Sequence, residues 1–259
     1  MITAGIDMGY ESVKIVLLKD GAVVGRAKGE SGGAGREAAA RKAWEEGLRN
    51  AGIAEGDVNR VVATGSGKYN VEFADDQITE GLSALKAIRF LCPDATAVID
   101  AGADETLVAT VKGERIGEMA VNQKCAAGLG AFLSYMARRL ELTLDEMSGL
   151  GRPGADSPAV NDGCVVFAEL EALSLLNQGA SPEEVAAAVT EIAAVRASSV
   201  VNDITVPAWN RVALVGGLTK NTAFVNALKV HAGMDFVIPG EAEYAGAVGA
   251  ALFAAEQRK

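Results

Sequence analysis

The chain carries one short pattern twice, at a constant spacing of 93 residues between positions 7 and 100. Residues 6–21 read IDMGYESVKIVLLKDG, and residues 99–114 read IDAGADETLVATVKGE. Each copy predicts a strand, a D-x-G turn, a second strand (13–18 and 107–111), a tight turn and a third strand (22–27 and 115–121). A duplicated unit of this kind predicts an α/β protein of two similar lobes with a cleft between them.

Helix and strand signals fill the rest of each lobe. We predict further strands at 61–63 and 212–215, and helices at 38–51, 78–91, 130–140, 164–179 and 244–256. A loop rich in glycine, proline and serine is expected at 149–158, and Ser181-Pro182-Glu183-Glu184 is typical of a helix start. We divide the chain into an N-terminal lobe (1–95), a C-terminal lobe (96–240) and a C-terminal helix (241–259) that packs back between the lobes.

Composition and charge restrict the class of protein. The 259 residues are 49% hydrophobic and 22% charged, as in a soluble globular protein. The net charge of −10, with no Lys/Arg run to offset it, argues against a nucleic-acid partner. Asp7 and Glu11 interrupt the apolar stretch that a signal peptide would need, and no apolar run approaches the roughly 20 residues of a membrane span. We therefore expect a cytoplasmic protein that contacts neither nucleic acid nor membrane.

Two acidic turns that face each other across a cleft suit a nucleotide and its metal. Asp7 and Asp100 can hold a hydrated Mg²⁺, which prefers oxygen ligands and bridges nucleotide phosphates. Gly9 and Gly102 let backbone N–H groups approach those phosphates. A third motif, LVGGLTKN at 214–221, is a strand that ends in paired glycines, and it allows an adenosine to lie against bare backbone. Each motif alone is compatible with an ordinary strand and turn, whereas all three in this order indicate a nucleotide site.

These motifs resemble those of the superfamily of acetate kinase, sugar kinases, heat-shock chaperone ATPases and actin, in which two ribonuclease H-like lobes close on ATP. More narrowly, the chain resembles the ATP-dependent activators of 2-hydroxyacyl-CoA dehydratases and the ATP-binding subunits of benzoyl-CoA reductase. The most specific stretches are KCAAGLGAF (124–132) and CVVFAELEAL (164–173). The resemblance runs from residue 4 to residue 252, and its other stretches are AGIDMGYESVKIVLLKDG, VATGSGK, DDQITE, VIDAGADE, VGGLTKN and YAGAVGAAL.

The resemblance implies roles for individual residues. It places catalysis on Asp7, Asp100 and Glu105. Contacts with the nucleotide and its phosphates would come from Gly9, Ser12, Lys14, Gly102, Asp104, Gly216, Gly217 and Asn221. Two turns depart from the family pattern: Tyr10 and Glu11 replace small hydroxyl residues after the first D-x-G, and residues 102–105 read GADE where the dehydratase activators show G-G-Q-D. These departures predict ATP binding that is modified, slow or divided between this chain and a paralogous subunit.

The three cysteines, Cys92, Cys125 and Cys164, are too far apart for a local metal knuckle, and a disulfide framework is implausible in a cytosolic chain of this length. Cys125 and Cys164 each stand where a helix is predicted to begin, and the N–H groups and dipole of a helix start lower a thiol pKa. Two buried, inert cysteines are the alternative. A 4Fe–4S cluster takes four thiolates, and the resemblance implies a dimer in which Cys125 and Cys164 of two chains share one cluster. We take Cys92, before Pro93, as structural, and His231, the only histidine, as a surface or packing residue.

Three functions remain open. The first is an ATP-dependent activator with Mg²⁺ and a shared 4Fe–4S cluster, which takes electrons from ferredoxin or flavodoxin and delivers them at low potential to an acyl-CoA dehydratase or reductase component. Its partner in the dimer would be a second copy of the chain or a paralogous ATP-binding subunit. The second function is a small-molecule kinase, such as a sugar kinase, with inert cysteines, although no catalytic base or sugar-binding set stands out. The third is a nucleotide-sensing or scaffold protein with a degenerate site, motivated by Tyr10 and Glu11.

Overall fold

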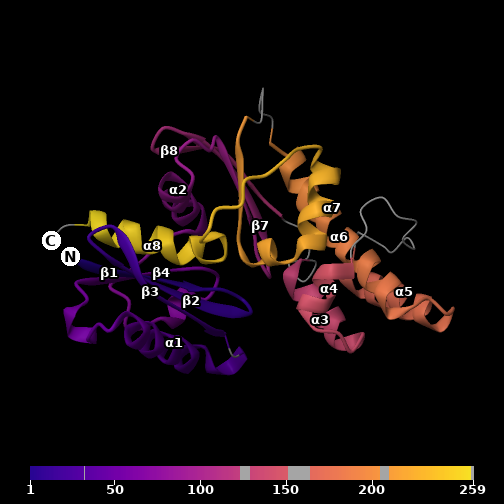
Figure 1. The fold of residues 1–259 in the computed structure, drawn as a ribbon, viewed down its shortest axis with the longest axis horizontal. Coiled ribbons are helices and arrows are strands. Elements are labelled where there is room, and N and C mark those ends of the chain that lie inside the picture. Colours follow the sequence, from indigo (N-terminus) through magenta and orange to yellow (C-terminus); the bar gives the residue numbers. More distant parts are fainter. Residues whose placement is uncertain (32, 123–128, 151–163, 205–209, 258–259) are drawn as a thin grey trace.

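The two copies of the repeat build two β-sheets of related topology. The computed structural model describes residues 1–31, 33–122, 129–150, 164–204 and 210–257. Among these residues, the first sheet has the strand order β3-β2-β1-β4-β5 and the second has the order β8-β7-β6-β9 (Figure 1). The strands are β1 Ile2–Met8, β2 Ser12–Lys19, β3 Ala22–Glu30, β4 Arg60–Thr64, β5 Asp76–Gln77, β6 Ala97–Ala101, β7 Thr106–Lys112, β8 Arg115–Val121 and β9 Val212–Val215.

The register of the sheets places the two repeated aspartates at equivalent positions. Asp7 near the end of β1 lies opposite Thr64 of the parallel strand β4. Asp100 near the end of β6 lies opposite Val215 of the parallel strand β9. Because the carboxyl ends of β1 and β4, and of β6 and β9, lie at one edge of each sheet, each aspartate stands where a parallel α/β sheet presents its loops.

The turns that follow these aspartates are closed in the same way. The Gly9 N–H donates to the carbonyl of Ser12 at 3.0 Å, and the Gly102 N–H donates to the carbonyl of Glu105 at 2.9 Å. Each turn then leads into an antiparallel strand, β2 or β7. The predicted duplication of a strand–turn–strand unit is therefore confirmed in three dimensions.

Helices cover both sheets. Helix α1 packs against β2 and β3 and buries Trp44 and Leu48 there. The helices are α1 Arg36–Ala51, α2 Glu80–Leu91, α3 Gly130–Arg139, α4 Leu144–Leu150, α5 Val165–Asn177, α6 Pro182–Asn202, α7 Thr222–Ala232 and α8 Ala245–Glu256. Short 3₁₀ turns are η1 Gly33–Gly35, η2 Glu55–Asp57, η3 Lys68–Asn70, η5 Gly217–Lys220 and η6 Ala242–Tyr244. The predicted helix start at Ser181 is confirmed, because Ser181 and Glu184 form a capping box at α6.

One hydrophobic cluster joins the two halves through α2 and α8, which lie between the sheets (Figure 1). It includes Val16 of β2, Val98 of β6 and Val215 of β9 together with Ile88 of α2 and Val248 of α8. The halves therefore share part of their core. The division of the chain near residues 95 and 240 stays a prediction; β6 begins at Ala97 and η6 at Ala242.

The backbone of α8 meets its neighbours without side chains between them. A Cβ atom at Gly5 of β1 would lie 1.9 Å from the carbonyl oxygen of Ala247. A Cβ at Gly249 would lie 1.9 Å from the carbonyl oxygen of Ser83 in α2. These glycines allow α8 to sit directly on β1 and on α2, since any larger residue would force the elements apart.

The predicted elements are confirmed with bounds that differ by three residues or fewer, except at 149–158. There α4 reaches Leu150, so the expectation of a loop from Gly149 was wrong, and residues 151–158 lie outside the described residues. The signal for this helix was a capping box: the Glu146 N–H donates to the Thr143 hydroxyl at 3.1 Å, and the Glu146 carboxylate accepts from the Thr143 N–H at 2.7 Å.

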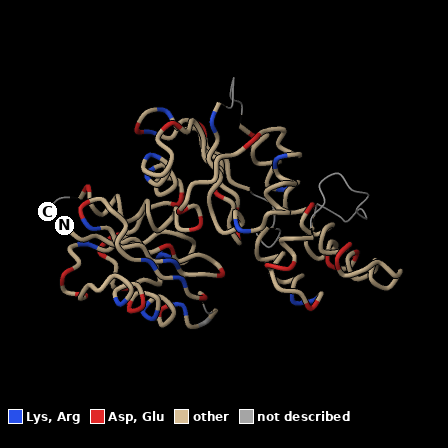
Figure 2. Tube along the Cα trace, in the orientation of Figure 1, with Lys and Arg blue, Asp and Glu red and all other residues tan. Residues whose placement is uncertain are grey.

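Two residues set apart by the sequence lie in the packed body. Cys92 is 4% exposed and belongs to the cluster that joins the halves. His231 on α7 has its Nε2 atom 2.6 Å from Oε1 of Glu191 on α6, so it joins two packed helices. Acidic and basic residues are interspersed over both halves (Figure 2). None of the helices in the described part of the chain combines the length and apolar character that a membrane crossing needs.

Candidate functional site

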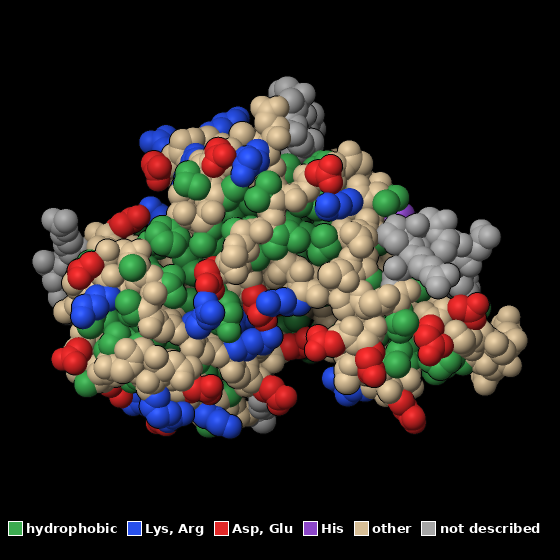
Figure 3. Space-filling model, viewed as in Figure 1, with side chains coloured by type: hydrophobic (Ala, Val, Ile, Leu, Met, Phe, Trp, Pro, Cys, Tyr) green, Lys and Arg blue, Asp and Glu red, His purple; other side chains and the backbone are tan. Residues whose placement is uncertain are grey.

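The two D-x-G turns open into one cavity of about 1170 Å³ between the halves. Its walls come from the β1–β2 turn and β3 on one side and from the β6–β7 turn, α3, α4 and η5 on the other. The surface is hollowed here, and acidic and basic side chains gather around the opening (Figure 3). A cavity of this size exceeds the roughly 300–1,000 Å³ of an ordinary small-molecule pocket, so it has room for a nucleotide and a metal.

A buried lysine lies beside the repeated aspartates. Lys14 on β2 is 8% exposed, and its Nζ atom lies 3.4 Å from Oδ2 of Asp7. Burial alone would lower the pKa of Lys14, but the carboxylates of Asp7 and Asp100 outweigh burial and raise that pKa. The pKa of Asp100 is raised to about 6, first by burial and then by the charge of Asp7. A divalent cation between the two carboxylates would favour their charged forms, because opposite charge lowers a carboxyl pKa.

A glycine with positive φ follows the strand beside each aspartate. Gly65 after β4 has a φ of 88°, and Gly216 after β9 has a φ of 93°. A Cβ atom would lie 2.6 Å from Oδ1 of Asp7 at Gly65, and 2.5 Å from Oδ1 of Asp100 at Gly216. Both positions thus require glycine, for conformation and for space. Gly65 was not among the predicted site residues, although the repeat could have identified it. The segment TGSGK (64–68) at the end of β4 corresponds to VGGLTK (215–220) at the end of β9.

An acidic pair, Asp104 and Glu105, follows the second D-x-G turn. The pKa of Glu105 is raised to about 7, first by burial and then by the neighbouring charges of Asp104 and Glu80. Glu80 begins α2 and accepts a hydrogen bond from Lys68 at 3.2 Å. A carboxyl group that titrates near neutrality can accept a proton from water and release it again, so Glu105 has the property of a general base.

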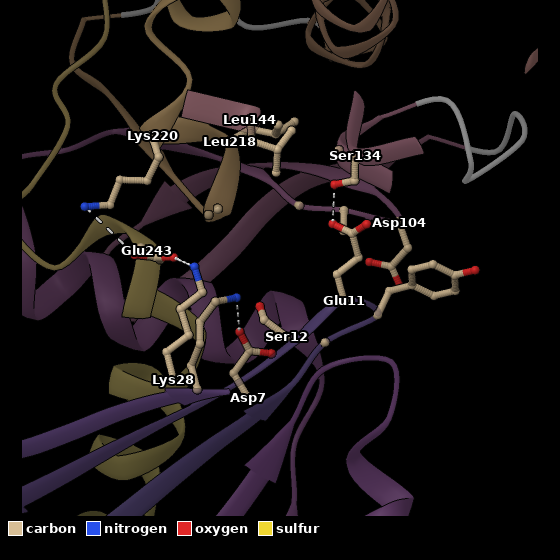
Figure 4. Close-up of a pocket in the computed structure, with 18 of the residues that line it drawn as sticks. Asp7, Glu11, Ser12, Lys28, Asp104, Ser134, Leu144, Leu218, Lys220 and Glu243 are labelled. Atoms are coloured by element: carbon tan, nitrogen blue, oxygen red, sulfur yellow. Dashed lines mark hydrogen bonds and ion pairs between the residues drawn. The ribbon is translucent and has the colours of Figure 1, made fainter. Parts of the chain in front are cut away.

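Glu11 reaches across the cavity to the second half of the molecule. The Ser134 hydroxyl on α3 donates to Oε2 of Glu11 at 2.8 Å (Figure 4). Burial raises the pKa of Glu11, and the Ser134 hydrogen bond acts in the opposite direction. The carboxylate that departs from the family pattern therefore has a partner in α3. Tyr10 beside it is 53% exposed and lies under the Arg36 guanidinium, 6.0 Å from ring centre to Cζ.

A second charged group lies on the η5 side of the cavity. Glu243 of η6 is bonded to Lys28 of β3, and Nζ of Lys220 lies 3.9 Å from its Oε2 atom (Figure 4). None of these three residues was among the predicted site residues. Lys220 lies within the LVGGLTKN motif but was not predicted as a site residue. No local motif marks Lys28 or Glu243, because the fold brings positions 28, 220 and 243 together from both halves of the chain.

The structure brings the predicted nucleotide-site residues to one cavity. It is lined by Asp7, Gly9, Ser12, Lys14, Asp100, Gly102, Asp104, Glu105, Gly216, Gly217 and Asn221. Asn221 also caps α7, where its Oδ1 accepts from the Phe224 N–H at 2.8 Å. Its buried Nδ2 has no hydrogen-bond partner in the described part of the chain. Ser66 and Gly246 line the same cavity and were not predicted.

The cysteine at the start of α5 lies outside this cavity. Cys164 precedes α5 in an extended conformation. The backbone N–H groups of Phe167 and Val166 at the start of the helix lower the pKa of the thiol. Cys125, the other predicted cluster ligand, lies outside the described residues.

The donor set of the cavity fits Mg-ATP as a substrate. Asp7 and Asp100 supply carboxylate oxygens, and the bare backbone at Gly65 and Gly216 leaves room beside them. The buried Nδ2 of Asn221 offers a donor. No group of three or more His, Cys, Asp or Glu side chains among the described residues is arranged to hold a metal ion by itself. Mg²⁺ would therefore keep most of its ligands as water and phosphate oxygens, as it does in many nucleotide sites.

The described residues also fit one part of a 4Fe–4S site. Cluster ligation takes thiolates, and the lowered pKa of Cys164 favours that form. Four thiolates are needed for a whole cluster, and Cys164 is a candidate for one of them.

Two repeated α/β lobes around one acidic cleft define the fold class of acetate kinase, sugar kinases, heat-shock chaperone ATPases and actin. The fold class predicted from the repeat is confirmed. Residues 4–254 match the BadF/BadG/BcrA/BcrD ATPase family, and the chain belongs to that family.

Similar proteins cover almost the whole chain. An activator of lactoyl-CoA dehydratase from Anaerotignum propionicum is 35% identical over 99% of this chain and 98% of its own length. A 2-hydroxyisocaproyl-CoA dehydratase activator from Clostridioides difficile is 32% identical over 100% of this chain and 97% of its own. The solved structure of the activator of the 2-hydroxyisocaproyl-CoA dehydratase from Clostridium difficile, with bound ADPNP, superimposes on this chain with a TM-score of 0.90 at 32% identity. The match covers 99% of this chain and 95% of the other.

Proposed function

We propose that this chain is an ATP-dependent activator that delivers low-potential electrons to an acyl-CoA dehydratase or a benzoyl-CoA reductase-type component. The observation that carries the proposal is the pairing of two features in one chain. A nucleotide-sized cleft with two opposed D-x-G turns lies in the same molecule as Cys164, whose thiolate is favoured by two backbone N–H groups. Family membership and the names of the similar activators support the same function.

The cleft residues have distinct parts in ATP hydrolysis. Asp7 and Asp100 hold the hydrated Mg²⁺, and Lys14 balances the two carboxylates between turnovers. Glu105, whose pKa is raised to about 7, takes the proton of the water whose oxygen attacks the γ-phosphorus, while the bond to the β-phosphate oxygen breaks and ADP leaves. Gly216 and Gly217 offer bare backbone to the adenosine. Each of these steps uses a side chain or backbone that lines the cavity.

The cysteines would hold a 4Fe–4S cluster between two chains. A second copy of this chain or a paralogous ATP-binding subunit would supply the remaining pair of thiolates. The cluster would supply the single low-potential electron, received from ferredoxin or flavodoxin. In this chain, Cys164 is set at the start of α5, where the Val166 and Phe167 N–H groups stabilise the negative charge of the sulfur.

The test is the iron content of protein purified without oxygen. We expect about four irons and four sulfides per dimer, lost in Cys125→Ala and in Cys164→Ala. Cys92→Ala is the matched control, because Cys92 is buried in the core and should keep the iron while the protein melts at a lower temperature. The purified protein should also support electron transfer to a dehydratase or reductase component in an ATP-dependent manner.

Two results would contradict the proposed function and favour one of the two alternative functions. Protein that holds no iron when prepared without oxygen, and that phosphorylates a sugar, would make it a small-molecule kinase of the same fold. Protein with no Mg-ATP turnover would make it a nucleotide-sensing or scaffold protein. Turnover that is abolished by Asp7→Asn or Asp100→Asn would exclude the degenerate site.

A further inference from the structure

Helix α3 is attached to both D-x-G turns. At its start, the Gly130 and Ala131 N–H groups donate to the carbonyls of Gly102 and Ala103 at 3.3 Å and 2.9 Å. One turn further along, Ser134 donates to Glu11 beside the first D-x-G turn. One short helix therefore contacts the phosphate-facing turns of both halves, and a change in their separation must tilt or shift it.

The residue after Ser134 connects α3 to α5. The Tyr135 hydroxyl donates to Oε1 of Glu169 on α5, and Arg139 lies on both, with its Nε 2.9 Å from the Tyr135 oxygen and its Nη2 3.4 Å from Oε1 of Glu169. Neighbouring helix positions point about 100° apart. Ser134 can therefore face the cleft while Tyr135 faces α5, on the same rigid element.

Helix α5 also packs on α6. Among its described residues, Ala168 and Ala172 are buried, whereas Val166, Phe167 and Leu170 are 61%, 58% and 57% exposed. Val165, Leu175 and Leu176 of the same helix are partly buried against the core that includes α6. The bonds of Glu169 with Tyr135 and Arg139 add a polar attachment of α5 to α3. Cys164 lies five residues before Glu169, roughly 7.5 Å along the helix axis.

We infer that α3 transmits the state of the nucleotide cleft to Cys164 through the Tyr135–Glu169 bond. Ser134 is the cleft-side contact of α3, and Tyr135 and Glu169 are positioning residues for the start of α5. The inference rests on the proposed function and assigns its regulation to named side chains. It also gives a use to Glu169, which belongs to the CVVFAELEAL stretch and lies outside the cavity.

Hydrogen exchange of α5 with and without Mg-ADPNP tests this route, on the whole protein purified without oxygen. In the wild type we expect the analogue to change the exchange rate of the α5 backbone amides by about fivefold or more, the lower end of ordinary allosteric coupling. In Tyr135→Phe and Glu169→Ala that change should fall below about twofold, since the bond is missing. Glu169→Gln keeps an acceptor for the tyrosine and should restore part of the change. Ser134→Ala, which cuts the contact with Glu11, should reduce it from the other end.

The measured quantity separates coupling from simple support. If the Tyr135–Glu169 contact only stabilises α5, its loss would raise the exchange rate by the same factor with and without the analogue. That result would contradict the inference. The controls are Tyr69→Phe, at a 76% exposed tyrosine, and Glu183→Ala, at an exposed residue of α6; both should keep the wild-type change. Nucleotide binding is measured separately by calorimetry. Variants that bind Mg-ADPNP and keep the full change in α5, or a wild type that binds it with α5 unchanged, would overturn the inference and leave the proposed function standing. A wild type that does not bind Mg-ADPNP would overturn both.

Discussion

Replacing Gly216 with alanine should damage the fold and the cleft together. A φ of 93° with a ψ of 172° lies in a region that is essentially restricted to glycine, and it costs another residue about 1–3 kcal/mol. The added Cβ would also lie 2.5 Å from Oδ1 of Asp100 and 2.4 Å from the carbonyl oxygen of Ala101, and overpacking of this kind costs about 1–3 kcal/mol. The free energy of unfolding should therefore fall by about 2–6 kcal/mol, which lowers the melting temperature by on the order of 10 °C. Mg-ATP binding should weaken as Asp100 is displaced.

The neighbouring residue provides the matched control. A Cβ at Gly217 would have no atom within 4 Å, so Gly217→Ala should melt within about 2 °C of the wild type. Because Gly217 lines the cavity, the same change should still weaken nucleotide binding. Thermal unfolding of the ligand-free proteins and calorimetry with Mg-ATP measure the two effects. If Gly216→Ala melts with the wild type, or Gly217→Ala melts as early as Gly216→Ala, the assignment of Gly216 as a required contact of Asp100 is wrong.

Three further perturbations follow from the same contacts. The pKa of Asp100 is about 6 in the folded protein against 3.8 ordinarily, so the unfolded state loses this proton at a lower pH than the folded state. The free energy of unfolding should therefore fall as pH rises from about 4 to about 6. Urea unfolding should show a smaller fall in Asp100→Asn, and an equal fall in both proteins would refute the raised pKa. Gly249→Ala should lose about 1–3 kcal/mol or more of stability, because its Cβ would meet a carbonyl of α2 at 1.9 Å, while Gly240→Ala, with open space around it, should melt as the wild type does. Glu11→Gln keeps an acceptor for Ser134 but removes a negative charge from the cavity. Calorimetry at pH 8 should therefore show about fivefold tighter Mg-ATP binding. An unchanged affinity would show that the Glu11 charge does not repel the bound phosphates.

The duplicated motif was sufficient to predict the frame of the site. A strand that ends in aspartate and turns at glycine twice, 93 residues apart, fixes two equivalent sheet edges, and the cleft follows from their meeting. Asp7 and Asp100 could be assigned for this reason. Gly65 was within reach of the same reasoning, since the repeat extends to the parallel strand that pairs with each aspartate.

Contacts between distant segments could not be predicted from one sequence. Lys28 and Glu243 are 215 positions apart and meet only because α8 folds back on the first sheet. The bond from Ser134 to Glu11 spans 123 positions, and Glu11 alone suggested repulsion of phosphate rather than a partner across the cleft. Side-chain direction at such positions depends on the relative placement of the two halves, which no local period or turn signal encodes.

Because α8 packs on the first sheet, the N-terminal half of the molecule cannot complete its core until the last residues of the chain have been synthesised. The Thr3 hydroxyl donates to the carbonyl of Ala251, 248 positions later, and the sheet face with Val16 and Val62 is covered by α8 residues from 247 onward. At about 5–20 residues per second, that face waits roughly 10 to 50 seconds for its cover. The lobe that begins first is thus among the last parts to finish, and its apolar sheet face is where a nascent-chain chaperone would bind.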